Sequence, residues 1–138
     1  MTNWKLLAVV TIGGGLGSVA RFLATVLVQQ RAALDFPAAT FIINVTGSFL
    51  IGFLTQIGVD TAMLSPEARL FLTTGFCGGF TTFSTFSYET YRLIEDGEYR
   101  TAGLYVVSSV VLSLAGCAIG MATAHRLIAG RPARLGAD

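Results

Sequence analysis

The sequence has little charge for its length. Only 12% of its 138 residues are Asp, Glu, Lys or Arg, against about 25% in a typical soluble domain, whereas 53% are hydrophobic. The mean hydropathy is +0.68. A soluble chain of this size buries only roughly 60–70% of the surface that unfolding exposes, so it could not hide so much apolar surface from water. The composition therefore predicts an integral protein of a lipid bilayer.

Charge is absent from three long stretches. Residues 36–59, 70–88 and 101–124 contain no Asp, Glu, Lys, Arg or His, and their lengths of about 24, 19 and 24 residues are enough to cross a ~30 Å hydrocarbon core. A fourth apolar stretch, residues 6–30, contains one such residue, Arg21, near its far end. An arginine there can snorkel or face a wet interior. The sequence thus predicts four transmembrane helices.

The first stretch also has features of a secretory signal peptide. Lys5 is a basic start, an apolar run follows, and Ser18-Val19-Ala20 has the pattern of a cleavage site. The glycine-rich run Gly13–Gly17 is a poor signal core, however, and apolar residues resume at Phe22. A membrane helix is the better interpretation.

The sequence lacks the residue patterns that indicate several kinds of functional site. Cys77 and Cys117 have no metal-ligand spacing, and no basic run with interleaved aromatics predicts a nucleic-acid partner. The single histidine, His125, lies at a helix end, where an interaction with the helix dipole is a better interpretation than a catalytic role. Glu89, about one turn from the end of its helix, is the acid nearest to a span interior. We therefore expect neither an enzyme nor a proton-coupled transporter.

Local signals place the helices at residues 4–30, 36–59, 66–94 and 99–127, in one membrane domain (1–138) with a short tail (128–138). A polar turn at Arg31–Asp35 separates the first two helices. Ser65-Pro66-Glu67 is typical of a helix start, with an N-cap, a first-turn proline and an acid. Residues 95–98 turn the chain into the last helix. We expect an all-α fold.

The third helix contains a weak point. Residues 73–87 are dense in glycine, β-branched and hydroxyl side chains, which are poor helix formers. The pair Gly78-Gly79, followed by Thr81 and Thr82, favours a break near the middle of this helix. Broken membrane helices often use their freed carbonyls to hold a cation. The alternative is a continuous helix whose glycines let a neighbouring helix approach, as we expect for Gly13–Gly17 and Gly116–Gly120.

The positive charges barely distinguish the two sides of the membrane. The side with both termini carries Lys5, Arg69, Arg126, Arg131 and Arg134, and the other carries Arg31, Arg92 and Arg100, with Arg21 close to it. Roughly five against four is a weak bias under the positive-inside rule. The chain is therefore predicted to insert in both orientations, so that two copies can pair as an antiparallel dimer.

Neutral polar side chains form two stripes inside the spans, each with a four-residue spacing that places its members on one helix face. Such donors can replace part of an anion's hydration shell without trapping the ion. The same residues can also bond their own helix or hold helices together. The stripes are Thr40, Asn44 and Ser48 in one helix and Tyr105, Ser109 and Ser113 in another.

Two phenylalanines follow the expected break. Phe83 and Phe86 lie on one helix face, and the positive edges of their rings could meet an anion. Two phenylalanines at this spacing are also ordinary packing residues, and the spacing does not separate these interpretations.

Three segments together resemble the CrcB/Fluc fluoride channel family. The segment GFCGGFTTFSTF (residues 75–86) is similar to the signature of the family's third helix. FIINVTGSF (41–49) and GGGLGSVARF (13–22) resemble its motifs in the second and first helices. The match covers nearly the whole chain in the right order.

This resemblance implies an antiparallel dual-topology homodimer in the bacterial plasma membrane that exports fluoride passively through two pores. A structural sodium ion would be held by backbone carbonyls of Gly78 and Thr81 in both copies. The resemblance places the fluoride pathway on Asn44, Phe83, Phe86, Tyr105, Ser109, Ser113, Thr40 and, least directly, Arg21.

Two other functions stay open on the residues alone. A small dual-topology exporter of organic cations would need an acid deep in a span, which the sequence lacks. A membrane subunit that only packs against partners would use the polar stripes to hold helices together. Selectivity for fluoride rests on the resemblance, because spacing alone does not exclude chloride.

Overall fold

The computed structural model describes residues 4–31, 36–60 and 63–130, and all regular structure in these residues is helical. Residues 32–35 of the expected polar turn and residues 131–138 of the expected tail lie outside the described residues. The elements are α1 (Trp4–Arg31), α2 (Ala38–Asp60), α3 (Pro66–Leu70), η1 (Phe71–Cys77), α4 (Gly78–Phe80), α5 (Phe83–Glu95) and α6 (Tyr99–Ala129).

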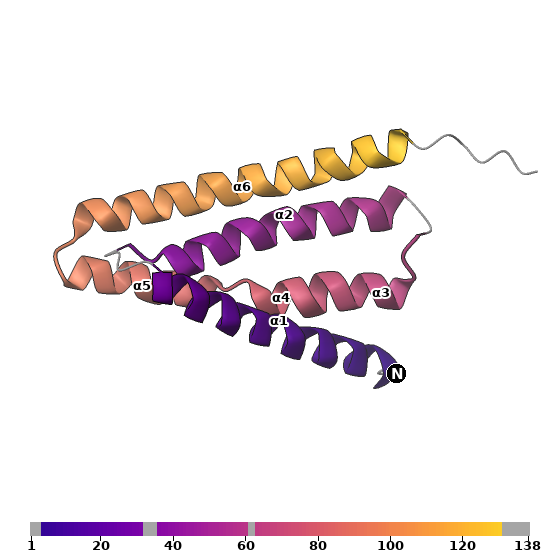
Figure 1. Ribbon diagram of the computed structural model, residues 1–138, viewed down its shortest axis with the longest axis horizontal. Coiled ribbons are helices and arrows are strands. Elements are labelled where there is room, and N and C mark those ends of the chain that lie inside the picture. The colour runs from indigo at the N-terminus through magenta and orange to yellow at the C-terminus, as the bar shows by residue number, and fades with distance from the viewer. Residues whose placement is uncertain (1–3, 32–35, 61–62, 131–138) are drawn as a thin grey trace, which may run out of the picture.

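Three helices are long and apolar enough to cross a membrane. They cover Trp4–Gln30, Ala38–Asp60 and Tyr99–Ala129, with mean hydropathies of 1.7, 1.7 and 2.0. Large apolar side chains such as Leu104 and Val107 are exposed on them, as expected for surfaces that meet lipid or another chain. The fourth expected span is not one continuous helix but the series α3, η1, α4 and α5, which runs alongside α2 (Figure 1).

The helices approach closely where glycines face a neighbour. The helix α6 packs along α2, while α1 packs against η1 and α4 (Figure 1). A Cβ atom added at Gly120 would overlap the carbonyl oxygen of Phe49, and one at Gly17 would overlap that of Phe76. These contacts confirm that the glycines of the first and last helices serve close packing.

The predicted break in the third helix is confirmed. Thr81 (φ −79°, ψ 157°) and Thr82 (φ −151°, ψ 116°) are extended between α4 and α5. The preceding segment η1 is a π-helix, which the sequence did not predict. Wide helical turns of this kind are frequent near functional sites. The backbone is therefore irregular on the N-terminal side of the break as well as at it.

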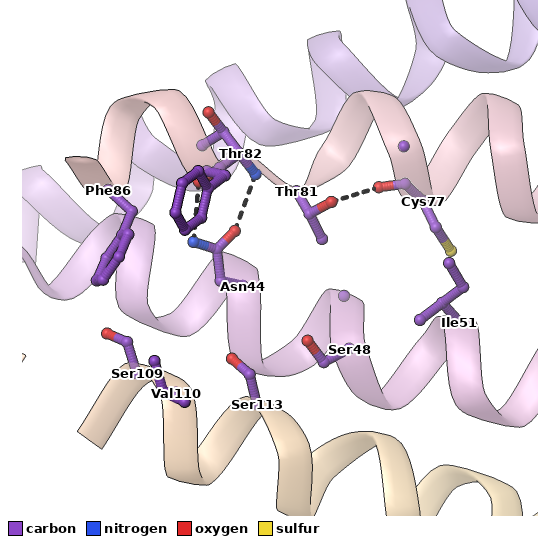
Figure 2. Close-up of a pocket in the computed structure, with 13 residues that line it drawn as sticks. Asn44, Ser48, Ile51, Cys77, Thr81, Thr82, Phe86, Ser109, Val110 and Ser113 are labelled. Carbon is purple, nitrogen blue, oxygen red and sulfur yellow. Dashed lines mark hydrogen bonds between the residues drawn. The ribbon is translucent and has the colours of Figure 1, made fainter. Parts of the chain in front are cut away.

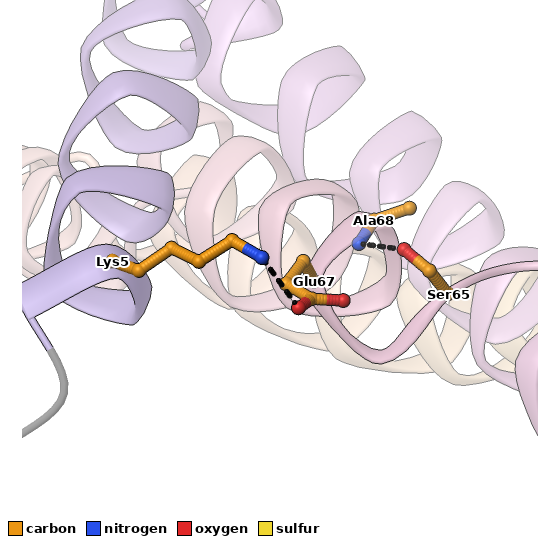
Figure 3. Close-up of polar contacts among 4 residues, drawn as sticks. All are labelled: Lys5, Ser65, Glu67 and Ala68. Carbon is orange, nitrogen blue, oxygen red and sulfur yellow. Dashed lines mark hydrogen bonds and ion pairs between the residues drawn. The ribbon is translucent and has the colours of Figure 1, made fainter.

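The expected helix start at Ser65 is also confirmed. Its hydroxyl accepts a hydrogen bond of 3.1 Å from the amide of Ala68 (Figure 3). Pro66 occupies the first turn. Lys5 donates to the carboxylate of Glu67 over 2.9 Å, which ties the start of α1 to the start of α3. At the other end of the bundle, Gly97 (φ +80°) turns the chain from α5 toward α6, a conformation that favours glycine.

Candidate functional site

A cavity of about 300 Å³ lies beside the break in the third helix (Figure 2). It is bounded by α2, α6, the extended pair Thr81-Thr82 and the start of α5. None of the described residues that line it is Asp, Glu, Lys, Arg or His, so its polarity comes from hydroxyl, amide and backbone groups. Its lining includes most of the predicted pathway and cation-site residues, namely Asn44, Gly78, Thr81, Phe83, Phe86, Ser109 and Ser113, together with Ser48 and Thr82.

Asn44 joins α2 to the break. Its side-chain amide donates to the carbonyl of Thr82 over 3.0 Å and its oxygen accepts from the amide of Thr82 over 2.9 Å (Figure 2). The backbone amide of Thr82, which the break removes from the helical pattern, thereby gains a partner, as low-polarity surroundings require. The carbonyl of Thr82, at the N-cap of α5, gains a donor besides the first bond of that helix. The side-chain amide of Asn44 has a second N–H that takes no part in these two hydrogen bonds. Asn44 is therefore a structural residue at the edge of the cavity that retains one donor.

Four carbonyl oxygens, those of residues 78–81, lose their regular helical donors at the break. In a continuous helix the amide of Thr82 would bond to Gly78 and the amide of Thr85 would bond to Thr81. The Thr82 amide bonds instead to Asn44, and the Thr85 amide bonds over 3.2 Å to the hydroxyl of Thr82. The carbonyls of Gly78 and Thr81, the two positions predicted for sodium, are therefore among those released by the break.

The chemistry of these donors fits a hard monovalent cation. Among the described residues, no group of three or more His, Cys, Asp or Glu could hold a metal ion. Backbone oxygens are the alternative that broken membrane helices offer. The two predicted carbonyls of one chain do not make a complete shell, which would need further oxygens from a second copy or from water.

Ser109 presents to the cavity a hydroxyl that has no hydrogen-bond partner among the described residues. Its side chain is buried, and its oxygen has no hydrogen-bond partner within the described part of the chain. The neighbouring Ser108, by contrast, donates to the carbonyl of Leu104 over 2.6 Å. A buried and unpaired hydroxyl costs free energy, and a polar cavity that holds water or an ion removes that cost.

The two phenylalanines differ in their surroundings. Phe86 is buried and its ring centre lies 5.1 Å from that of Tyr105. Phe83 lines the same cavity but is 78% exposed, with its ring centre 5.6 Å from that of Phe86. An aromatic side chain so exposed at the break is typical of a surface that another chain covers.

Thr40 and Tyr105 lie away from this cavity. Both hydroxyls donate to the carboxylate of Glu89, over 2.9 Å and 2.7 Å. Glu89 is half-buried, and with Arg92 it lines a second cavity of about 310 Å³. Glu89 was not among the predicted pathway residues, although its spacing of three residues from Phe86 places both on one face of α5.

Arg21 lines neither of these two cavities. It is half-buried on α1, and its carbonyl accepts from the hydroxyl of Thr25 over 2.9 Å. The structure therefore gathers most of the predicted pathway in one place, sets Thr40 and Tyr105 around a carboxylate, and leaves Arg21 apart.

Comparisons with known proteins find a matching family and several similar proteins. The model of the CrcB-like protein (camphor resistance) family matches residues 8–121. A fluoride-specific ion channel FluC of Chlorobaculum tepidum is 54% identical over 111 residues, which cover 80% of this chain and 87% of the relative. The channel of the same name from Geobacter sulfurreducens is 48% identical over 118 residues, covering 86% and 95%.

The fold and site define an all-helical membrane protein with an uncharged polar cavity at a helix break. The chain belongs to the CrcB/Fluc family, as its motifs predicted. Membership also confirms the expectation that the protein is not an enzyme, because the relatives are channels.

Proposed function

We propose that the protein is a fluoride-selective channel through which fluoride leaves the cytoplasm by passive electrodiffusion, so that the cell is protected against fluoride toxicity. The observation that carries this proposal is the uncharged polar cavity at the break, in a chain whose relatives are named fluoride-specific channels. The site of action is the plasma membrane of a bacterium.

The cavity offers an anion donors without a fixed positive charge. The hydroxyls of Ser109 and Ser113 and the second N–H of Asn44 can replace part of the hydration shell of fluoride. The ring edges of Phe83 and Phe86 carry partial positive charge and add weak attraction. An arginine or lysine in the same place would hold the ion too tightly for conduction.

Thr40 and Tyr105 form the carboxylate end of the proposed pathway. Their hydroxyls occupy both oxygens of Glu89, and these two bonds disperse its negative charge beside the route of an anion. Arg21 is assigned to an aqueous entrance of the pathway, where its charge would attract anions from solution.

A structural sodium ion at the freed carbonyls would stabilise the break. Gly78 and Thr81 of one copy and the same residues of a second would contribute four oxygens. The ion supplies positive charge that compensates backbone dipoles turned out of their helices. Its role is to hold two broken helices together rather than to be transported.

The proposed assembly is an antiparallel homodimer with two pores around the central sodium. Gly78 and Phe83 are exposed at the break in a single chain, so a second copy can reach both of them. The weak charge bias permits insertion in both orientations. A two-fold axis in the membrane plane would then pair the same surface of each copy.

The test is ion efflux from liposomes that contain the purified protein, measured in parallel with fluoride- and chloride-selective electrodes. Rapid fluoride release with chloride release at the level of empty liposomes is the expected result. No fluoride release from protein that is dimeric by cross-linking would refute the proposal.

Glu89 gives one specific reason to test a second function, a proton-coupled exporter. Its half-buried carboxylate is the type of group that carries protons in such transporters. Collapsing a pH gradient across the liposomes separates the two functions. Passive fluoride flux would persist, whereas coupled transport would stop.

A further inference from the structure

A third cavity, of about 360 Å³, lies at the end of the bundle where α1 begins, α2 ends and α3 begins. Leu6, Val59 and Leu70 give it an apolar wall, and Arg69 is the only charged residue among the described residues of its lining. It is separate from the cavity beside the break, because no described residue lines both of them.

Arg69 is held in place by the backbone of α2. One of its guanidinium nitrogens donates to the carbonyl of Gly58 over 3.3 Å. A Cβ atom added at Gly58 would lie 2.6 Å from Cδ of Arg69, so the arginine stem passes across the space that glycine leaves open. A guanidinium has five N–H donors, and most of these remain for a ligand.

The nearby acids are engaged with other groups. Glu67 accepts from Lys5 over 2.9 Å, and a carboxylate oxygen of Asp60 lies 3.6 Å from Nδ1 of His125 on α6. No carboxylate of the described chain lies within ion-pair distance of Arg69. The cavity therefore combines an oriented positive charge with an apolar wall.

The position of this cavity matches the boundary between lipid tails and headgroups. Trp4, which begins α1, is 80% exposed, and tryptophan favours that boundary. Basic pockets between membrane helices at this level suit acidic lipid headgroups. A guanidinium binds phosphate through paired N–H groups, and the apolar wall suits an acyl chain.

We propose that this cavity binds an anionic phospholipid, with the lipid phosphate on Arg69 and an acyl chain along Leu6, Val59 and Leu70. The bound lipid would connect the ends of α1, α2 and α3 at the membrane surface. This inference is independent of what the channel conducts.

The test is native mass spectrometry of the purified protein with phosphatidylglycerol, and with phosphatidylcholine as the uncharged comparison. Arg69→Gln should weaken phosphatidylglycerol binding roughly tenfold, the loss expected for a charge-assisted hydrogen bond. Gly58→Ala should weaken it as well, because it displaces the guanidinium without removing the charge. Arg126→Gln is the matched control, since Arg126 is exposed in the last turn of α6 and does not line the cavity.

Three results would overturn the proposal. Equal losses in Arg69→Gln and Arg126→Gln would show general surface attraction. Equal binding of both lipids would remove the role of charge. Competition by inorganic phosphate as effective as that by the lipid would show a simple anion site. Size-exclusion profiles confirm that the variants fold, and fluoride efflux in phosphatidylcholine liposomes tests the proposed function separately.

Discussion

The same two polar stripes supply two regions of opposite character. Around Glu89, the hydroxyls of Thr40 and Tyr105 are bound to a carboxylate. One turn along the same helices, Asn44 and Ser109 face a cavity without charge, and the hydroxyl of Ser109 is unpaired within the described chain. Four residues along each helix thus separate a polar cluster whose hydroxyls are bonded to a shared acceptor, Glu89, from a polar cavity that retains unbonded donors. Only the second region can offer donors to an ion without first breaking bonds.

Phe86 lies between the two regions, and its replacement should have the largest effect. Phe86→Ile keeps an apolar side chain but removes the ring that lines the cavity and contacts Tyr105. We expect fluoride efflux to fall to the level of empty liposomes while the dimer still forms. Phe83→Ile should give the same loss. Unchanged efflux in both variants, measured at equal protein content, would refute the aromatic part of the pathway.

Asn44→Ala should have the next largest effect because it leaves the backbone amide of Thr82 unpaired at the break and removes one donor from its carbonyl. The free energy of unfolding should fall by about 2 kcal/mol or more, and fluoride efflux should fall with it. Ser48→Ala is the control on the same face of α2, since Ser48 lines the same cavity. Denaturant unfolding in detergent measures the difference. Equal stability of the two variants would show that the amide does not hold the break.

Glu89→Gln should have the smallest effect of the three. It keeps one oxygen acceptor and replaces the other with a donor, so one of the two partner hydroxyls must reverse its bond. We expect a loss of about 1 kcal/mol in stability and a less than roughly threefold change in efflux. Efflux at several pH values measures this. A loss of efflux as large as that expected for Asn44→Ala would show that conduction depends on the carboxylate and not on the neutral cavity.

The sequence predicted those features that depend on local chemistry. Long stretches without charge indicated the spans, and Gly78-Gly79 with the following threonines indicated the break. Contacts between helices were harder to predict, because periodicity assigns a residue to a face but does not set the register against a neighbouring helix. The pairing of Asn44 with Thr82 and of Tyr105 with Glu89 depends on that register. The π-helix in residues 71–77 likewise has no local signature in the sequence.

The most direct test of the central claim, that fluoride passes the neutral cavity, compares two adjacent serines. Ser109→Ala removes the buried hydroxyl that faces the cavity, whereas Ser108→Ala removes one already bound to the carbonyl of Leu104. Initial fluoride efflux should slow roughly tenfold in the first variant and stay near wild type in the second. Equal rates in the two variants would contradict this route for the ion.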